Sequence, residues 1–187
     1  MSKVVAGLRP GGRSARIQEA VHQAVLDLQA SMDHAQMTIP LIAKQAGVTP
    51  STIYRRWGCL ATLLSDVALA KLQPDSMPQD YGSFQADLTA WFEQYFEEYS
   101  SEVGHHLLVD ISSNPESDDR EQCYELVSQQ LQVIIDRAKQ RNEPYIEVQL
   151  IIEIIISPLI YMILFSRKQL EMDYAHQLLK RLFEDYL

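Results

Sequence analysis

Hydrophobic residues recur at helical spacing along most of the chain. The clearest stripe has apolar side chains three, four or seven positions apart, at Phe84, Leu88, Trp91, Phe92, Tyr95, Phe96 and Tyr99. Similar patterns predict further helices over residues 101–112, 120–141, 145–168 and 173–186. Loops are expected at residues 114–119 and 142–144. No strand and no internal repeat is indicated after residue 72, so the chain is predicted to be all-α.

Residues 38–57 predict two short helices joined by a tight turn. Thr38 can cap the first helix, and Gly47 supplies the left-handed conformation that ends it. Thr49 is expected to cap the second helix and Pro50 to start it. The segment therefore predicts a helix-turn-helix unit.

The second of these helices has two different faces. Winding it at about 100° per residue places Ile53 and Trp57 on one apolar face. The opposite face and its flanks carry Ser51, Thr52, Tyr54, Arg55 and Arg56. A helix with one buried edge and one polar edge of this size fits the major groove of DNA.

The stretch IAKQAGVTPSTIYRRW resembles the DNA-binding signature of TetR-type transcriptional repressors, and the resemblance is specific over residues 14–72. It implies an N-terminal three-helix DNA-binding domain in residues 1–72. A helical ligand-binding and dimerisation domain is expected in residues 73–187, after a proline-containing connector. The DNA-contacting residues expected from the resemblance are Thr38, Thr49, Pro50, Ser51, Thr52, Tyr54, Arg55 and Arg56.

Two positions depart from the family pattern. Leu60 stands where the family usually has a lysine that contacts phosphate, so one phosphate contact is expected to be lost. Asp33 stands near the glycine that commonly closes the first helix. Aspartate tolerates a left-handed conformation better than most residues, which predicts that conformation near Asp33.

Charge is distributed unevenly. Residues 1–72 hold eight Lys or Arg against four Asp or Glu, whereas residues 73–187 hold eight against twenty-one. The negative excess therefore lies away from the predicted DNA-reading helix. A basic, glycine-containing arm carries Lys3, Arg9, Arg13 and Arg16. It is open whether this arm contacts DNA or is an ordinary terminus.

The apolar segment 148–165 predicts a subunit interface, because one small bundle does not easily cover so much apolar surface. Glu153, Ser157 and Pro158 interrupt it, and its core is shorter than the roughly 20 residues of a membrane span. A buried helix, kinked at Pro158, is expected instead of a membrane segment. The resemblance implies a homodimer through the last two helices.

Aromatic residues of the second domain are candidates for an effector site. Flat amphipathic ligands bind well between aromatic walls that carry hydroxyl groups. The candidate residues are Trp91, Tyr95, Tyr99, His106, Tyr124 and Tyr161. Plain core or dimer packing is the alternative for each of them. His105 and His106 are neighbours and point in different directions on a helix, so no metal site is expected.

Several function classes find no support. We find no GxSxG, HExxH, Walker or dinucleotide motif, so no enzyme and no cofactor are expected. Cys59 and Cys123 form neither a zinc pattern nor a disulfide scaffold, and a cytoplasmic protein without a signal peptide is expected.

The sequence thus predicts a homodimeric, ligand-responsive repressor that leaves operator DNA when a small molecule binds. The alternative is a helical interaction protein that has lost specific DNA binding, for which Leu60 and the acidic second domain are the motives.

Overall fold

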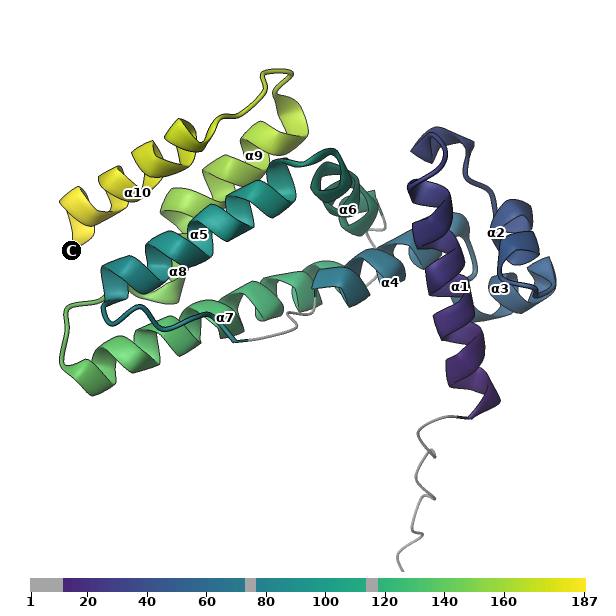
Figure 1. Ribbon diagram of the computed structural model, residues 1–187, viewed down its shortest axis with the longest axis horizontal. Helices are drawn as coiled ribbons and strands as arrows, with labels where there is room; N and C mark the ends of the chain where they lie inside the picture. Colours follow the sequence, from purple (N-terminus) through teal and green to yellow (C-terminus); the bar gives the residue numbers. More distant parts are fainter. Residues whose placement is uncertain (1–11, 73–76, 114–117) are drawn as a thin grey trace, which may run out of the picture. The chain divides into compact units, whose positions relative to one another are not determined.

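The computed structural model describes residues 12–72, 77–113 and 118–187. The chain divides into two compact units, Met1–Val67 and Ala68–Leu187 (Figure 1). All regular elements in the described ranges are helical, which confirms the predicted all-α class. The domain boundary expected after residue 72 stays a prediction, since the compact units divide inside a helix, after Val67.

The first unit is built from short helices around its own core. They are α1 (Arg13–Gln29), the 3₁₀ turn η1 (His34–Gln36), α2 (Ile39–Gln45), α3 (Pro50–Trp57) and α4 (Leu60–Leu72), which continues beyond this unit. The core residues are Val21, Ala24, Val25, Met37, Ile39, Ile42, Ala43, Ile53, Trp57, Leu63, Leu64 and Val67. Each of the four helices therefore contributes apolar side chains to one cluster.

The α2–α3 connection forms from local signals in the sequence. The Thr38 hydroxyl accepts a 3.4 Å hydrogen bond from the Leu41 amide, as the predicted cap requires. Gly47 has φ of +67°, and the Val48 amide donates to the Ala43 carbonyl at 3.0 Å. This is the bond that closes a helix through a left-handed residue. The predicted glycine turn is confirmed.

The expected left-handed conformation near Asp33 is wrong. Asp33 is extended, with φ −62° and ψ 133°, and its carboxylate accepts from the Ala35 amide at 3.0 Å. α1 ends earlier, at Gln29, and Ala30 after it is right-handed. The aspartate therefore starts the following 3₁₀ turn and does not close the first helix.

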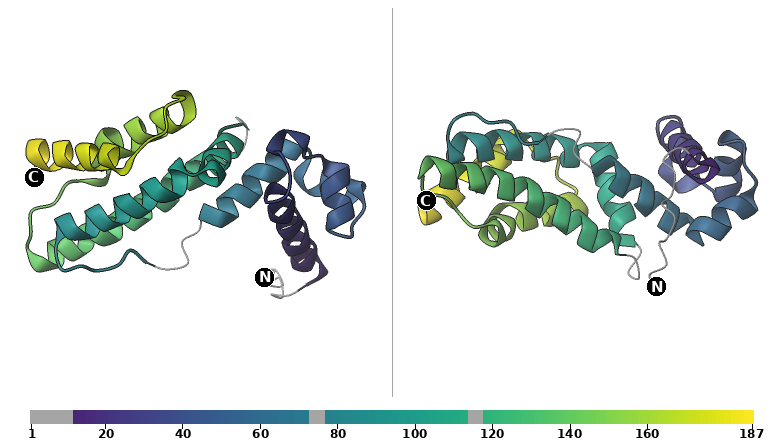
Figure 2. Two further views of the ribbon diagram at one scale, coloured as in Figure 1. Left: turned by 45° about the horizontal axis from the view of Figure 1, so that its top comes forward. Right: turned by 90° about the horizontal axis from the view of Figure 1, so that it is seen from below.

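The second unit contains the remaining helices. They are α5 (Phe84–Ser100), α6 (Glu102–Ser113), α7 (Asp119–Arg141), α8 (Val148–Ile151), α9 (Ser157–Phe165) and α10 (Met172–Tyr186). α5 contacts α6, α7 and α10 (Figure 2). Its stripe from Phe84 to Tyr99 is buried as predicted and forms much of this unit's core.

The helix predicted over residues 145–168 starts later than expected, at Val148. Ile146 is inserted into the core with 2% exposure. The Lys139 ammonium lies 4.8 Å from the centre of the Tyr145 ring. These contacts hold the residues before Glu147 in a non-helical connection.

Between α8 and α9, residues Ile152–Ile156 form a π-helical turn, labelled η2. Pro158 follows it directly and has no N–H to donate to the carbonyl of Ile154. A π turn changes the hydrogen-bond register at this point. The interruption expected from Pro158 therefore takes the form of a widened helical turn.

The beginning of α5 is fixed to the end of α7 by charged groups. Arg141 donates to Asp80, Asp87 and Glu143, each at 3.0 Å. Asp87 is 1% exposed and also accepts from the Tyr81 amide. The hydrogen bond to Asp87 is the main cause that raises the pKa of Arg141. This network places the segment before α5 on the second unit.

Candidate DNA interface and effector region

α3 has the two faces that the sequence predicts. Ile53 is fully buried and Trp57 is 8% exposed, both in the core of the first unit. Tyr54 is 50% exposed, and Ser51 and Arg55 are also exposed. A helix anchored on one side leaves these polar side chains available to the floor of a DNA groove.

Hydroxyl groups cluster at the first turn of α3. The Thr49 hydroxyl lies 2.9 Å from that of Ser51 and 3.0 Å from that of Thr52. Thr49 makes no side-chain capping bond, so the expected cap is wrong, because neighbouring hydroxyls engage its oxygen. Pro50 does start the helix. Hydroxyl donors at a helix N-terminus provide a favourable environment for a phosphate oxygen.

Arg56 differs from Arg55 in having partners within the first unit. Its guanidinium donates to the Ser14 carbonyl at 2.7 Å and to the Ser14 hydroxyl at 3.0 Å. It also lies 5.3 Å from the centre of the Trp57 ring. Arg56 thus ties the end of α3 to the start of α1, and its predicted DNA contact stays a prediction.

A second tie at the end of α3 involves Asp66 of α4, which sequence reasoning missed. One Asp66 oxygen accepts from the Trp57 indole at 2.7 Å and pairs with His22 of α1 at 2.8 Å. The hydrogen bond with His22, assisted by that from Trp57, lowers the pKa of Asp66 against the opposing effect of burial. Residues 22, 57 and 66 share no local motif, so only the fold brings them together.

Leu60 and the N-terminal arm bear on phosphate contacts. Leu60, the first residue of α4, is half-buried and packs against the core of the first unit. This packing explains a leucine there. Lys3 and Arg9 lie outside the described residues, as does the Arg13 side chain, while Arg16 is exposed.

Three of the predicted effector residues form one aromatic row on α5. The ring centres of Trp91 and Tyr95 are 5.1 Å apart, and those of Tyr95 and Tyr99 are 4.2 Å apart. The Trp91 indole donates to the Gln130 side chain of α7 at 2.8 Å. Burial raises the pKa of both tyrosines, so their hydroxyls stay protonated. The row is an apolar wall with neutral polar tips.

The other three predicted effector residues lie in different surroundings. His106 is half-buried on α6, and its ring meets that of His105 edge-on. Tyr124 is 48% exposed and donates to Gln149 at 3.0 Å. Tyr161 is 64% exposed and packs on Phe165, with ring centres 5.1 Å apart. Their role in ligand binding stays a prediction.

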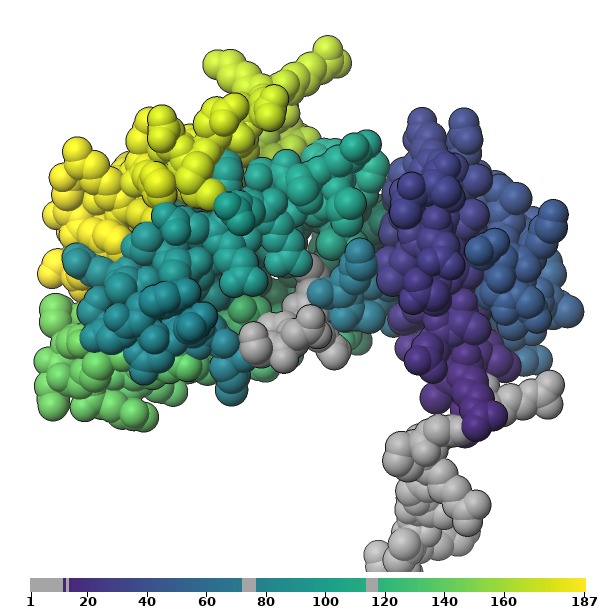
Figure 3. Space-filling model, viewed as in Figure 1, coloured from purple at the N-terminus to yellow at the C-terminus, as the bar shows by residue number. Residues whose placement is uncertain are grey.

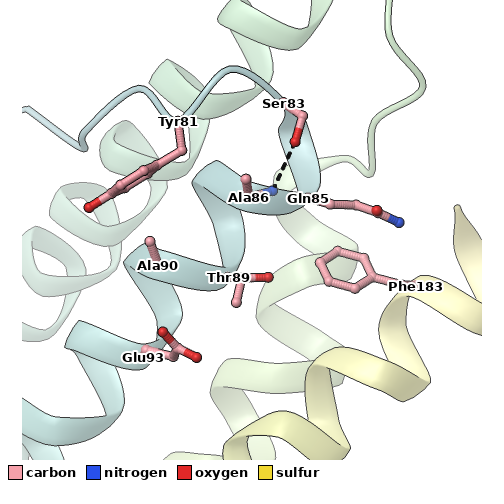
Figure 4. Close-up of a pocket in the computed structure, with 8 residues that line it drawn as sticks. All are labelled: Tyr81, Ser83, Gln85, Ala86, Thr89, Ala90, Glu93 and Phe183. Atoms are coloured by element: carbon pink, nitrogen blue, oxygen red, sulfur yellow. Dashed lines mark hydrogen bonds between the residues drawn. The ribbon is translucent and has the colours of Figure 1, made fainter.

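A groove of about 480 Å³ lies on the outer face of α5, beside α10 (Figure 4). Ala86, Thr89 and Ala90 form its floor, while Tyr81 and Phe183 stand at its sides. None of the six predicted effector residues lines it. Small side chains at a four-residue spacing were visible in the sequence, but nothing there marked them as a groove.

Residues Val148–Phe165 are long and apolar enough to cross a membrane by length and composition, although only 28% of them are buried within the structure. The expectation of a wholly buried helix is wrong, because this segment buries a single face. Tyr161 and Phe165 lie on its exposed side, and Phe165 is 72% exposed. Side chains where α9 joins α10 project from the second unit (Figure 3).

Among the described residues, no group of three or more His, Cys, Asp or Glu side chains could hold a metal ion. Cys59 is a free, exposed thiol and Cys123 is a free, half-buried one.

Comparisons with known proteins place this architecture. Residues 78–182, more than half of the chain, match the family described as "Tetracyclin repressor-like, C-terminal domain". The HTH-type transcriptional regulator AqdR of Rhodococcus erythropolis is 28% identical over 141 residues, which cover 73% of this chain and 68% of AqdR. The matched family segment lies wholly in the second domain, where the sequence resemblance was only general.

Solved structures share the fold at low sequence identity. Thermus thermophilus FadR, a TetR-family repressor in complex with lauroyl-CoA, has a TM-score of 0.65 at 16% identity, covering 91% of this chain and 95% of that one. A Mesorhizobium loti protein assigned to the TetR family has a TM-score of 0.58 at 16% identity, covering 94% and 97%. With the family match and the anchored helix-turn-helix unit, these findings show that the chain belongs to the TetR family of transcriptional regulators.

Proposed function

We propose that this regulator is a homodimeric repressor that binds operator DNA through α3 and dissociates when a small molecule binds its second unit. The observation that carries the proposal is the exposed edge of α3, where Tyr54 and Arg55 project from a helix anchored by Ile53 and Trp57. Thr38, Thr49, Pro50, Ser51, Thr52 and Arg56 complete the proposed DNA-contacting set. The proposal assigns no catalytic step to the chain and places it in the cytoplasm, where its DNA is.

Selection of genomic DNA tests the DNA-binding step. Fragments retained by the purified protein would be sequenced, and affinity for the enriched site compared between the wild type and Arg55→Ala. Arg167→Ala is a matched control, since Arg167 is an exposed arginine of the second unit. Arg55→Ala should weaken binding and Arg167→Ala should not. A wild type that enriches no site would favour the alternative, a helical interaction protein without specific DNA binding.

The effector is proposed to contact the aromatic row of Trp91, Tyr95 and Tyr99. A ligand releases DNA only if it binds the low-affinity arrangement of the protein more tightly than the DNA-bound one. Trp57→Phe leaves Trp91 as the sole indole, and its emission can be screened against aromatic and amphipathic metabolites. An acyl-CoA belongs in the screen because the Thermus FadR structure contains lauroyl-CoA.

The effect on DNA should be measured separately, in protein that keeps Trp57. A compound that shifts Trp91 emission should also weaken operator binding, by the same factor by which the operator weakens binding of the compound. Compounds that bind without altering operator affinity would contradict ligand-controlled release while leaving DNA binding intact.

Dimerisation is proposed to use α9 and α10. The exposed side of α9 carries Tyr161 and Phe165, whose large apolar surfaces are unusual on a lone soluble unit. Burial of the same patch on two copies would give a symmetric interface and present two α3 helices to the DNA. This proposal explains the exposed apolar face without a membrane.

A further inference from the structure

The C-terminal end of α3 is held by a single carboxylate that makes no use of the DNA-facing side. One oxygen of Asp66 receives the Trp57 indole N–H at 2.7 Å and His22 at 2.8 Å. An ionised carboxylate only accepts hydrogen bonds, so the bonded ring nitrogen of His22 carries a proton. Three helices, α1, α3 and α4, therefore meet at one oxygen atom.

This junction is partly shielded from water. The His22 side chain is 16% exposed and that of Asp66 is 35% exposed. The rings of His22 and Trp57 lie 6.2 Å apart, so they pack beside the carboxylate as well as binding it. Hydrogen bonds to a charged acceptor in such a setting are stronger than neutral ones.

The position of Asp66 along the chain gives the junction a second property. Asp66 lies in α4, one residue before the first compact unit ends at Val67, and α4 continues to Leu72. The helix that leaves the first unit thus carries the group that fixes α3. Trp57 receives this bond on the buried side of α3, opposite Arg55.

We propose that Asp66 is a positioning residue for DNA recognition, which sets the orientation of α3 through Trp57 and links it to α4. This assignment rests on the proposed function, since it requires that α3 reads DNA. Asp66 itself would touch no base and no phosphate. Loss of its side chain should misplace α3 while the first unit keeps its helices.

The test compares Asp66→Ala, Asp66→Asn and Asp27→Ala on the DNA site enriched from the genome. Asp27 is an exposed carboxylate of α1 in the same unit, so its removal changes the charge equally. Loss of hydrogen bonds to a charged group predicts that Asp66→Ala weakens binding about tenfold or more. Asp27→Ala should bind as tightly as the wild type or more tightly. Asp66→Asn keeps an oxygen acceptor for Trp57 and should recover most of the affinity.

A spectroscopic measurement separates positioning from folding. In a Trp91→Phe background Trp57 is the only indole, and Asp66→Ala should change its emission and its quenching by iodide. Asp66→Asn should resemble the parent. If Asp66→Ala does not fold, Trp57→Phe replaces it, because this variant keeps a ring in the core and loses only the N–H donor. It should also weaken DNA binding.

Two results would overturn the inference. One is Asp66→Ala, folded, binding the site as Asp27→Ala does, and the other is Trp57→Phe with wild-type affinity. If the unsubstituted protein enriches no DNA site, the proposed function fails and this assignment fails with it. Retained wild-type binding with insensitive variants would overturn the assignment alone.

Discussion

Truncation of the exposed aromatic pair on α9 should dissociate the protein. Phe165 is 72% exposed and Tyr161 is 64% exposed, and their rings pack together. In a symmetric interface each side chain would be buried twice, once on each protomer. We therefore expect Phe165→Ala and Tyr161→Ala to raise the dissociation constant of the dimer with little effect on the helices of each protomer.

The exposed fractions set the size of the effect. An aromatic side chain offers about 200 Å², of which roughly 140 Å² of Phe165 is available to a partner. At about 25 cal/mol per Å², complete burial on both protomers would contribute about 7 kcal/mol. Partial burial and loss of side-chain freedom reduce this value. A loss of about 3 kcal/mol, or roughly 100-fold in the dissociation constant, is expected for Phe165→Ala.

Sedimentation over a range of protein concentrations measures this constant, and circular dichroism checks the helices. Tyr81→Ala is the matched control, because Tyr81 is an aromatic residue with 55% exposure outside α9 and α10. A monomeric wild type at micromolar concentration would refute the proposed interface. Equal dissociation by Tyr81→Ala would show that the patch on α9 is not special.

Three further perturbations have defined outcomes. Arg55→Ala should cost about 1 to 3 kcal/mol of operator binding if it reads a guanine, with an unchanged melting temperature, whereas equal losses of binding and stability would contradict a reading role. Leu60→Lys should steepen the salt dependence of DNA binding by up to about 0.9 per protomer and lower the melting temperature, because Leu60 packs on the core; an unchanged salt slope would place the start of α4 away from phosphate. The pKa of Asp66 is lowered on folding, so its contribution to stability is present above its ordinary pKa of 3.8 and is lost as pH falls through the lower folded value. Acid unfolding followed by Trp57 emission should lose this component in Asp66→Asn, and identical acid profiles would contradict the linkage.

Elements specified by neighbouring residues could be predicted from the sequence. Thr38, Gly47 and Pro50 delimit α2 and α3 through capping, left-handed geometry and a fixed φ, and these effects act within a few residues. The buried stripe of α5 followed from spacing alone. Asn142, which closes α7 with φ of +54°, likewise lies where a break was expected.

Features that depend on distant residues could not be predicted in this way. The side chains of His22 and Asp66 are 44 positions apart in sequence and meet only because α1 and α4 pack together. Arg56 looked equivalent to Arg55, yet its partner Ser14 lies 42 positions away. Thr49 failed as a cap for a local reason, since two further hydroxyls compete for its oxygen.

The π turn at Ile152–Ile156 has a consequence for how related chains can differ in length. A π turn holds one more residue than the α-helical turn that it replaces. Removal of one residue here would restore a regular helix at Pro158 only by rotating everything after it by about 100°. Tyr161 and Phe165 would then point away from their present direction, while the five-residue turn keeps them on the exposed side. The length of this short segment therefore determines which surface of α9 is offered to another molecule.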